Sequence, residues 1–230
     1  MEKNDIDKAI VETCIKIIQE PLLYFSEADI QQLLAEELRN IKAIKKTYQT
    51  LINKGKDSNS LYKTSLLHRE YGGGGGRRID IVIFSENDAK QINNPNLKMG
   101  KEYLHPDFAF ELGTEKTANI GKHLVNDIEK LRNVKQTGYI IHIYTDRTIS
   151  RTGTERRDNT VEKIKKNFKN VFINNKCTDN KIKKLAILLS PFKDQKLTKG
   201  KCEIFNGKLW EKVNVNNEGK LRGKIFAQLG

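Results

Sequence analysis

Two acidic residues lie within strongly apolar stretches of the sequence. Glu111 sits in FAFEL (108–112), and Asp80 sits in RRIDIVIF (77–84). A buried carboxylate is costly unless a cation or hydrogen-bond donors meet it. Two neighbouring carboxylates also raise each other's pKa, and a divalent cation removes that repulsion. Because Mg²⁺ takes one or two carboxylates together with waters and phosphate oxygens, the pair predicts a site for Mg²⁺ or Mn²⁺.

Asp80 also has an ordinary structural interpretation. On its own it would be a strand-end acid paired with Arg77 or Arg78. Side chains alternate along a strand, so Asp80 shares a face with Val82 and Phe84. Two acids in two consecutive apolar strands favour a shared site over two unrelated surface pairs.

A helix that begins near Ser26 offers a third carboxylate. Glu27 lies in its first turn, at the edge of the side that carries Leu34 and Leu38. The helix dipole alone also favours a glutamate in a first turn. Glu37 lies nearer the centre of the apolar stripe and is the rival candidate for the helix carboxylate.

A run of five glycines, Gly72 to Gly76, invites a phosphate-loop interpretation. No Gly-Lys-Ser/Thr follows it, and the next element is a strand, whereas phosphate loops of the known kinds open a helix. The run is therefore interpreted as a hairpin tip that joins two strands.

Helical spacing of apolar residues predicts the helices that position these side chains. The predicted helices cover residues 6–22, 26–55, 118–134 and 157–170. Ser26 is a good N-cap for the second of them, which carries acidic residues in its first turn and ends at Gly55.

Short apolar runs predict the strands, and residues 85–107 are expected to form a polar surface loop. The predicted strands are residues 61–71, 77–84, 108–112, 138–145, 171–174 and 185–189, and a hairpin over residues 202–215 that turns at Asn206-Gly207. The order of elements predicts an α/β domain with a mixed central sheet flanked by helices. We expect one domain over residues 1–190, with its core at 26–145, and a C-terminal hairpin extension over 191–230.

The order of elements and the two acids together resemble the PD-(D/E)XK nuclease superfamily, which has the restriction-endonuclease-like fold. The resemblance covers residues 26–145: a helix with an early glutamate (SEADIQQLL), an aspartate in the second strand (RRIDIVIF) and Glu111-Leu112-Gly113 in the third. The helix HLVNDIEKLRNV and the buried strand GYIIHIYT follow in the family's order.

The resemblance implies roles for these residues. Asp80, Glu111 and the backbone carbonyl of Leu112 would hold Mg²⁺ or Mn²⁺, and Glu27 would complete the site. The family's lysine, which positions the attacking water and stabilises the charged transition state, is replaced by Gly113. Lys116 is the expected substitute, since glycine allows the chain to turn back.

Lys122 on the following helix is the second choice for that lysine. The implied activity is an endonuclease that hydrolyses DNA, in a restriction, mobile-element or repair setting. The alternative is a nuclease fold without catalysis, which binds nucleic acid or serves as a subunit of an assembly.

Composition agrees with a polyanionic partner. Lys and Arg number 42 against 29 Asp and Glu, a net charge of +13. DNA is the expected partner and RNA the second, although a lysine-rich genome composition would also explain the charge. Homodimers and larger assemblies both remain open. The three cysteines form no metal-binding pattern, and without a signal peptide or long apolar run the chain is expected in the cytoplasm, away from membranes.

Overall fold

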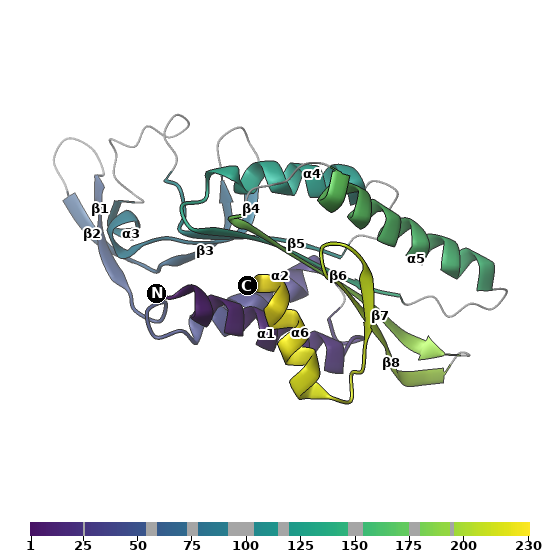
Figure 1. Cartoon of the computed structure of the whole chain (residues 1–230). Coiled ribbons are helices and arrows are strands. Elements are labelled where there is room, and N and C mark those ends of the chain that lie inside the picture. The colour runs from purple at the N-terminus through teal and green to yellow at the C-terminus, as the bar shows by residue number, and fades with distance from the viewer. Residues whose placement is uncertain are drawn as a thin grey trace.

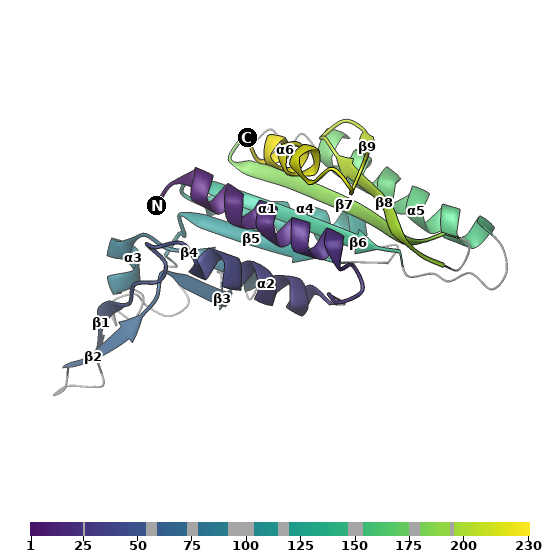
Figure 2. The ribbon, with the colours of Figure 1, turned by 90° about the horizontal axis from the view of Figure 1, so that it is seen from below.

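The protein is a mixed α/β structure in which one sheet lies between two layers of helices (Figure 1). The computed structural model describes residues 1–24, 26–53, 59–72, 78–91, 104–114, 120–146, 154–174, 180–193 and 196–230. Helices α4 (Ile120–Lys130) and α5 (Thr154–Lys169) cover one face of the sheet. Helices α1 (Lys3–Gln19), α2 (Glu27–Arg39) and α6 (Glu218–Leu229) cover the other face, which Figure 2 shows from below.

The main sheet has seven strands in the order β3-β4-β5-β6-β7-β8-β9. The strands are β3 (Leu67–Gly72), β4 (Arg78–Ile83), β5 (Phe108–Gly113), β6 (Thr137–Thr145), β7 (Ile182–Lys193), β8 (Lys196–Phe205) and β9 (Trp210–Val213). Neighbours are antiparallel except β5–β6 and β6–β7, which are parallel. Parallel neighbours need a crossover connection, and α4 and α5 supply the two crossovers. A separate ribbon of β1 (Tyr48–Asn53) and β2 (Asn59–Thr64) projects from one end (Figure 1).

Strand alternation divides the interior into two cores, one on each face of the sheet. Ile81, Phe110 and Tyr139 point toward α1, α2 and α6. Val82 and Ala109 point the other way, toward α4 and α5. The predicted central sheet flanked by helices is therefore confirmed, and the predicted strands 77–84, 108–112 and 138–145 correspond to β4, β5 and β6.

The two ends of the chain lie side by side on the same face of the sheet (Figure 2). Lys3 Nζ on α1 donates to the carbonyl of Leu229 on α6 at 2.6 Å. Arg222 on α6 also pairs with Glu12 on α1. These contacts join the first and last helices directly.

The predicted helix over residues 26–55 is too long. A capping box between Ser26 and Asp29 starts α2 as expected, but the helix ends at Arg39. Ile44 still reaches the core, through a turn. The aromatic and β-branched residues from Tyr48 onward favour an extended chain and form β1.

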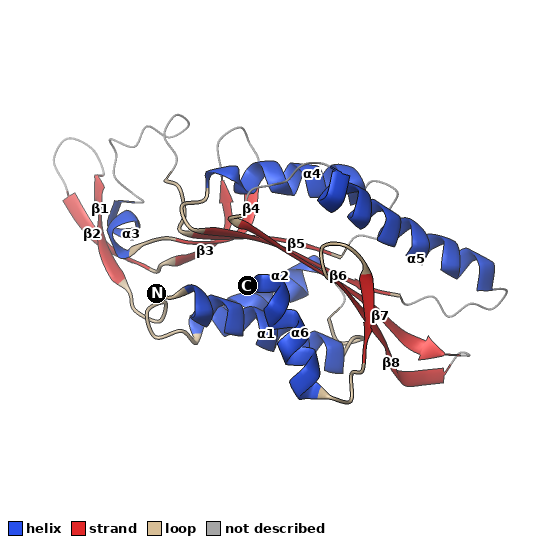
Figure 3. Ribbon diagram, in the orientation of Figure 1, coloured by secondary structure: helices blue, strands red, loops and turns tan. Residues whose placement is uncertain are grey.

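Three further local predictions are wrong, as Figure 3 shows by element type. Residues 61–71 are divided between β2 and β3, and the expected loop over 85–107 contains α3 (Glu86–Gln91), which Ser85 caps by accepting from Asp88 N–H. Residues 171–174 continue α5 as a π-helical turn, η3 (Asn170–Asn174), because Val171 and Phe172 bury against the same face.

The hairpin strands β8 and β9 extend the main sheet, and α6 follows them.

Candidate functional site

Asp80 and Glu111 lie on adjacent antiparallel strands. The register of Val82 with Ala109 and of Ile81 with Phe110 brings Asp80 level with Glu111 on the face that α4 covers. Glu111 is 1% exposed and Asp80 is 9% exposed. The backbone N–H of Leu112 donates to Asp80 Oδ2 at 2.7 Å and fixes that carboxylate beside β5.

The cation that meets Glu111 is Lys130, in the last turn of α4. Its Nζ lies 2.7 Å from Glu111 Oε2 and 3.4 Å from Asp127 Oδ1. The Lys130 side chain is 19% exposed, so most of it is withdrawn from solvent. The site therefore contains three carboxylates around a single ammonium among the described residues.

Burial and mutual repulsion dominate the electrostatics of the site. Burial, together with the charges of Asp80 and Asp127, raises the pKa of Glu111 to about 9, although the ammonium of Lys130 opposes this. Burial also raises the pKa of Asp80, against the hydrogen bond from Leu112. Burial lowers the pKa of Lys130, but the hydrogen bond to Glu111 and the three acidic charges outweigh it, so that pKa is raised.

Gly113 faces the ring of a buried histidine. In the parallel pairing of β5 and β6, Gly113 is the partner of His142, which is 3% exposed. A Cβ on Gly113 would lie only 2.3 Å from His142 Cε1. His142 Nε2 lies 3.4 Å from Asp127 Oδ2. The position where the resemblance expects a lysine is thus filled by an imidazole from the next strand.

Helix α2 reaches the same strands through an amide. Gln31 Nε2 donates to the carbonyl of Asp80 at 2.8 Å and to Glu70 Oε1 at 2.9 Å. Arg69 donates to Gln31 Oε1 at 2.6 Å. Gln31 is buried, so this network ties α2 to the backbone on which Asp80 sits.

The structure brings some of the predicted site residues together and not others. Glu27 is the exposed first residue of α2 and lies one turn before Gln31. Glu37 pairs with Lys16 of α1 instead, at 2.5 Å. Lys122 is exposed on α4. Lys116 lies outside the described residues.

The donor set fits a hard divalent cation. Glu111 Oε1 is buried and has no hydrogen-bond partner among the described residues, and Asp80 and the carbonyl of Leu112 lie on the adjoining backbone. Carboxylate and carbonyl oxygens are ligands that Mg²⁺ and Mn²⁺ accept. Within the described ranges no three His, Cys, Asp or Glu side chains form a metal-binding group, so waters and substrate oxygens would complete the coordination.

Sequence reasoning missed Lys130, Asp127, His142 and Gln31, although Asp127 and His142 leave a signal. Asp127 is spaced three residues from Leu124 and four from Leu131, which puts it beside the buried stripe of α4. His142 interrupts the apolar strand GYIIHIYT just as Glu111 interrupts FAFEL. Lys130 follows Asp127 by one turn, and only the three-dimensional structure pairs it with Glu111.

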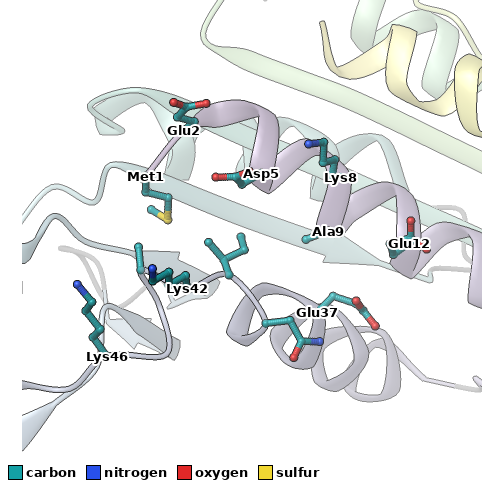
Figure 4. Close-up of a pocket in the computed structure, with 12 residues that line it drawn as sticks. Met1, Glu2, Asp5, Lys8, Ala9, Glu12, Glu37, Lys42 and Lys46 are labelled. Atoms are coloured by element: carbon teal, nitrogen blue, oxygen red, sulfur yellow. The ribbon is translucent and has the colours of Figure 1, made fainter.

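A surface groove lies on the opposite face of the sheet (Figure 4). It has a volume of about 650 Å³ and lies between α1 and the end of α2. Its lining mixes Glu2, Asp5 and Glu12 with Lys8 and Lys42. The sheet separates it from Glu111, so it is not part of the carboxylate site.

Comparisons with known proteins add no family assignment. Scans of protein-family models, curated proteins and solved structures found no match to this chain. Among the described residues, no helix has both the length and the apolar character needed to span a bilayer.

Proposed function

We propose that the protein is a metal-dependent endonuclease that hydrolyses phosphodiester bonds of DNA and has a restriction-endonuclease-like fold. The observation that carries the proposal is the pair of buried acids Asp80 and Glu111, on two adjacent strands, with the half-buried Lys130 on the helix that covers them. Burying such charges costs several kcal/mol per ion unless other groups compensate. A site built to bind a metal ion and a phosphate explains why the fold retains them.

The connectivity around the site supports this fold. After α2 and the β1–β2 ribbon, the chain forms the antiparallel strands β3, β4 and β5, with α3 between β4 and β5. It then passes through α4 to β6, which is parallel to β5. This is the order of helix, three-stranded meander, helix and strand on which the resemblance rests. The two acids also fall on the second and third strands of that meander.

The resemblance implies the metal-binding roles, and the contacts of Lys130 suggest its role. Asp80, Glu111 and the carbonyl of Leu112 would hold the metal ion. When bound, that ion would lower the pKa of the attacking water and neutralise charge on the phosphate. Lys130 takes the role of the strand lysine in place of Lys116 or Lys122, because among the described residues its ammonium is the one in contact with Glu111. A fixed ammonium there stabilises the negative charge that develops on the phosphate.

A basic groove on the same face supports a polyanionic substrate. The α5 groove has a volume of about 510 Å³ and lies between the second half of α5 and the β8–β9 turn. Its lining residues are Glu162, Lys163, Lys165, Lys166, Lys169, Lys208, Leu209 and Trp210. Lys165 is paired with Glu203 at 2.8 Å, and the other four lysines are exposed. Lysines spaced along a groove suit successive phosphates of a nucleic-acid backbone.

One observation favours a second candidate function. Gly113 leaves the third strand without a lysine, as expected for a nuclease fold that binds nucleic acid without cutting it. The two candidates differ in whether Lys130 supports catalysis.

Incubation of the purified protein with supercoiled plasmid, linear duplex DNA and RNA tests both candidates. Each substrate is combined with Mg²⁺, Mn²⁺ or EDTA. We expect metal-dependent cleavage of DNA that is lost in Asp80→Asn and Glu111→Gln and retained in Glu37→Gln, an acid on the other face. Cleavage that survives Glu111→Gln contradicts the proposal. Salt-dependent binding of DNA with no cleavage under any metal supports the second candidate, a nuclease fold that binds nucleic acid without cutting it.

A further inference from the structure

We infer that His142 and Asp127 are positioning residues that hold Lys130 against Glu111, and that this arrangement requires glycine at position 113. The catalytic role of this arrangement rests on the proposed function, but the contacts themselves do not depend on that function. The four side chains form one line of contacts from β6 through α4 to β5: His142 to Asp127, Asp127 to Lys130, and Lys130 to Glu111.

The first step is steric. The imidazole of His142 occupies the space beside β5 into which any side chain at position 113 would project. Three ring atoms would lie 2.3, 2.5 and 2.8 Å from a Cβ on Gly113, closer than packed atoms tolerate. A lysine at 113 and a histidine at 142 therefore exclude each other, so the ammonium must arrive from another element. Helix α4, packed over this face, supplies it.

The second step is a hydrogen bond and an ion pair that meet at Asp127. Asp127 uses Oδ2 toward His142 Nε2 and Oδ1 toward Lys130 Nζ, each at 3.4 Å. A carboxylate only accepts, so His142 is the donor of this contact, through Nε2. Nδ1 has no hydrogen-bond partner among the described residues. The ring packs nearly perpendicular to that of Phe168 of α5, with centroids 5.5 Å apart. The imidazole is thus held by packing on one side and by Asp127 on another.

The third step concerns the lysine itself. A lysine side chain is long and flexible, and its ordering costs up to about 2 kcal/mol of rotamer entropy. A catalytic ammonium that wanders by about 1 Å can lose a hundredfold in rate. Asp127, one turn before Lys130 on the same helix, restrains the ammonium, and His142 restrains Asp127. The pair therefore substitutes for the rigid strand position that a lysine at 113 would have had.

A double-mutant cycle tests the chain of contacts. We expect His142→Leu and Asp127→Asn each to lower the single-turnover cleavage rate at least tenfold, with the affinity for DNA unchanged. His142→Asn, which can still donate to Asp127, should retain more activity than His142→Leu. In a Lys130→Met background, His142→Leu should cause no further loss, because it acts through Lys130. An additive loss, or equal rates for the Asn and Leu variants, would overturn the inference.

A readout without catalysis keeps this separate from the proposed function. The ¹⁵N signal of the Lys130 ammonium should be visible by NMR in the metal-free protein, because a restrained and half-buried ammonium exchanges its protons slowly. We expect the signal to disappear in His142→Leu and to persist in His142→Asn. A signal that persists in His142→Leu refutes the positioning role even if DNA is cut. A wild type that cuts nothing but shows this pattern refutes the nuclease and supports the positioning role.

The steric step has its own measurement. Gly113→Ala should lower the urea midpoint of unfolding, and the loss should be smaller in a His142→Ala background, where the space is open. Gly72→Ala is the matched control, since a Cβ there meets nothing within 4 Å. If Gly113→Ala unfolds at the wild-type midpoint, His142 does not exclude a side chain at 113 and the inference is wrong.

Discussion

The ammonium of Lys130 lies 2.7 Å from Glu111 Oε2, although the two residues are nineteen positions apart along the chain. The contact joins the last turn of α4 to the middle of β5. It provides the partner that a carboxylate within an apolar strand requires. It also explains how a site can retain an ammonium when the strand itself offers only glycine two residues after the acid.

The catalytic role of Lys130 can be tested separately from the binding of DNA and metal. We expect Lys130→Met to lower the cleavage rate by about a hundredfold or more, the effect of losing one transition-state partner, with DNA and metal affinities nearly unchanged. Lys122→Met, an exposed lysine on the same helix, is the matched control and should cut normally. Lys116→Ala should also cut normally. If only Lys116→Ala is slow, Lys116 carries the role and Lys130 is structural.

The raised pKa of Glu111 makes a prediction about stability and pH. Burial raises this pKa from 4.5 to about 9, so between these values the folded protein holds a proton that the unfolded chain has lost. The contribution of Glu111 to the free energy of unfolding should therefore be fully present below about pH 4.5 and fall as pH rises toward 9, by up to about 1.4 kcal/mol per pH unit. Urea titrations of the metal-free protein across this range measure it.

Glu111→Gln isolates that contribution, because it removes the titrating group. The variant should lose less stability than the wild type between pH 5 and 9. Mn²⁺ should raise the wild-type midpoint more at pH 8 than at pH 5, since it binds the ionised carboxylate, and should leave Glu111→Gln nearly unaffected. A wild type and variant with parallel pH profiles would mean that Glu111 titrates normally.

The α5 groove predicts how binding responds to salt. Replacing Lys166, Lys169 and Lys208 by Gln should weaken DNA binding and reduce the slope of log affinity against log salt, by about 0.9 for each phosphate that the protein no longer neutralises. The control replaces Lys8, Lys42 and Lys46, which line the groove of Figure 4 on the opposite face. Equal effects in the two triple variants would show that binding follows net charge alone.

Helix α2 should act on the site through Gln31. Gln31→Leu leaves the carbonyl of Asp80 without its donor, a loss of about 1–3 kcal/mol in the free energy of unfolding, and should also slow cleavage by loosening β4. Glu37→Leu, which breaks a half-exposed pair with Lys16, should cost less than about 1 kcal/mol. Glu27→Ala tests the role that the resemblance implies for Glu27: a loss of cleavage with stability unchanged would place this residue in the site.

Much of the central sheet can be predicted from sequence because its signals are local. Buried strands such as FAFEL and GYIIHIYT are continuous apolar runs, and the amphipathic spacing of α4 is visible from Ile120 to Leu131. The boundaries that fail are those where apolar residues continue past the end of an element. Ile44 keeps helical spacing with α2, but it reaches the core through a turn.

The site is only half visible in the sequence for a different reason. Asp80 and Glu111 stand out because each interrupts an apolar strand. The partner of Glu111 depends on which turn of α4 packs over β5, and sequence spacing carries no information about that. His142 shows the same limit: its polarity marks it, but its exclusion of a side chain at 113 depends on the parallel register of β5 and β6.

The contact between Lys3 and Leu229 has a practical consequence for engineering. The start of α1 meets the end of α6. A short linker could therefore join the first residue to the last and give a circular permutant with new ends elsewhere. A fluorescent protein or affinity tag on either present end would leave from the face opposite Glu111. Such fusions should therefore interfere little with a long polymer lying across the α4 and α5 side, so single-molecule assays could tether the protein by either end.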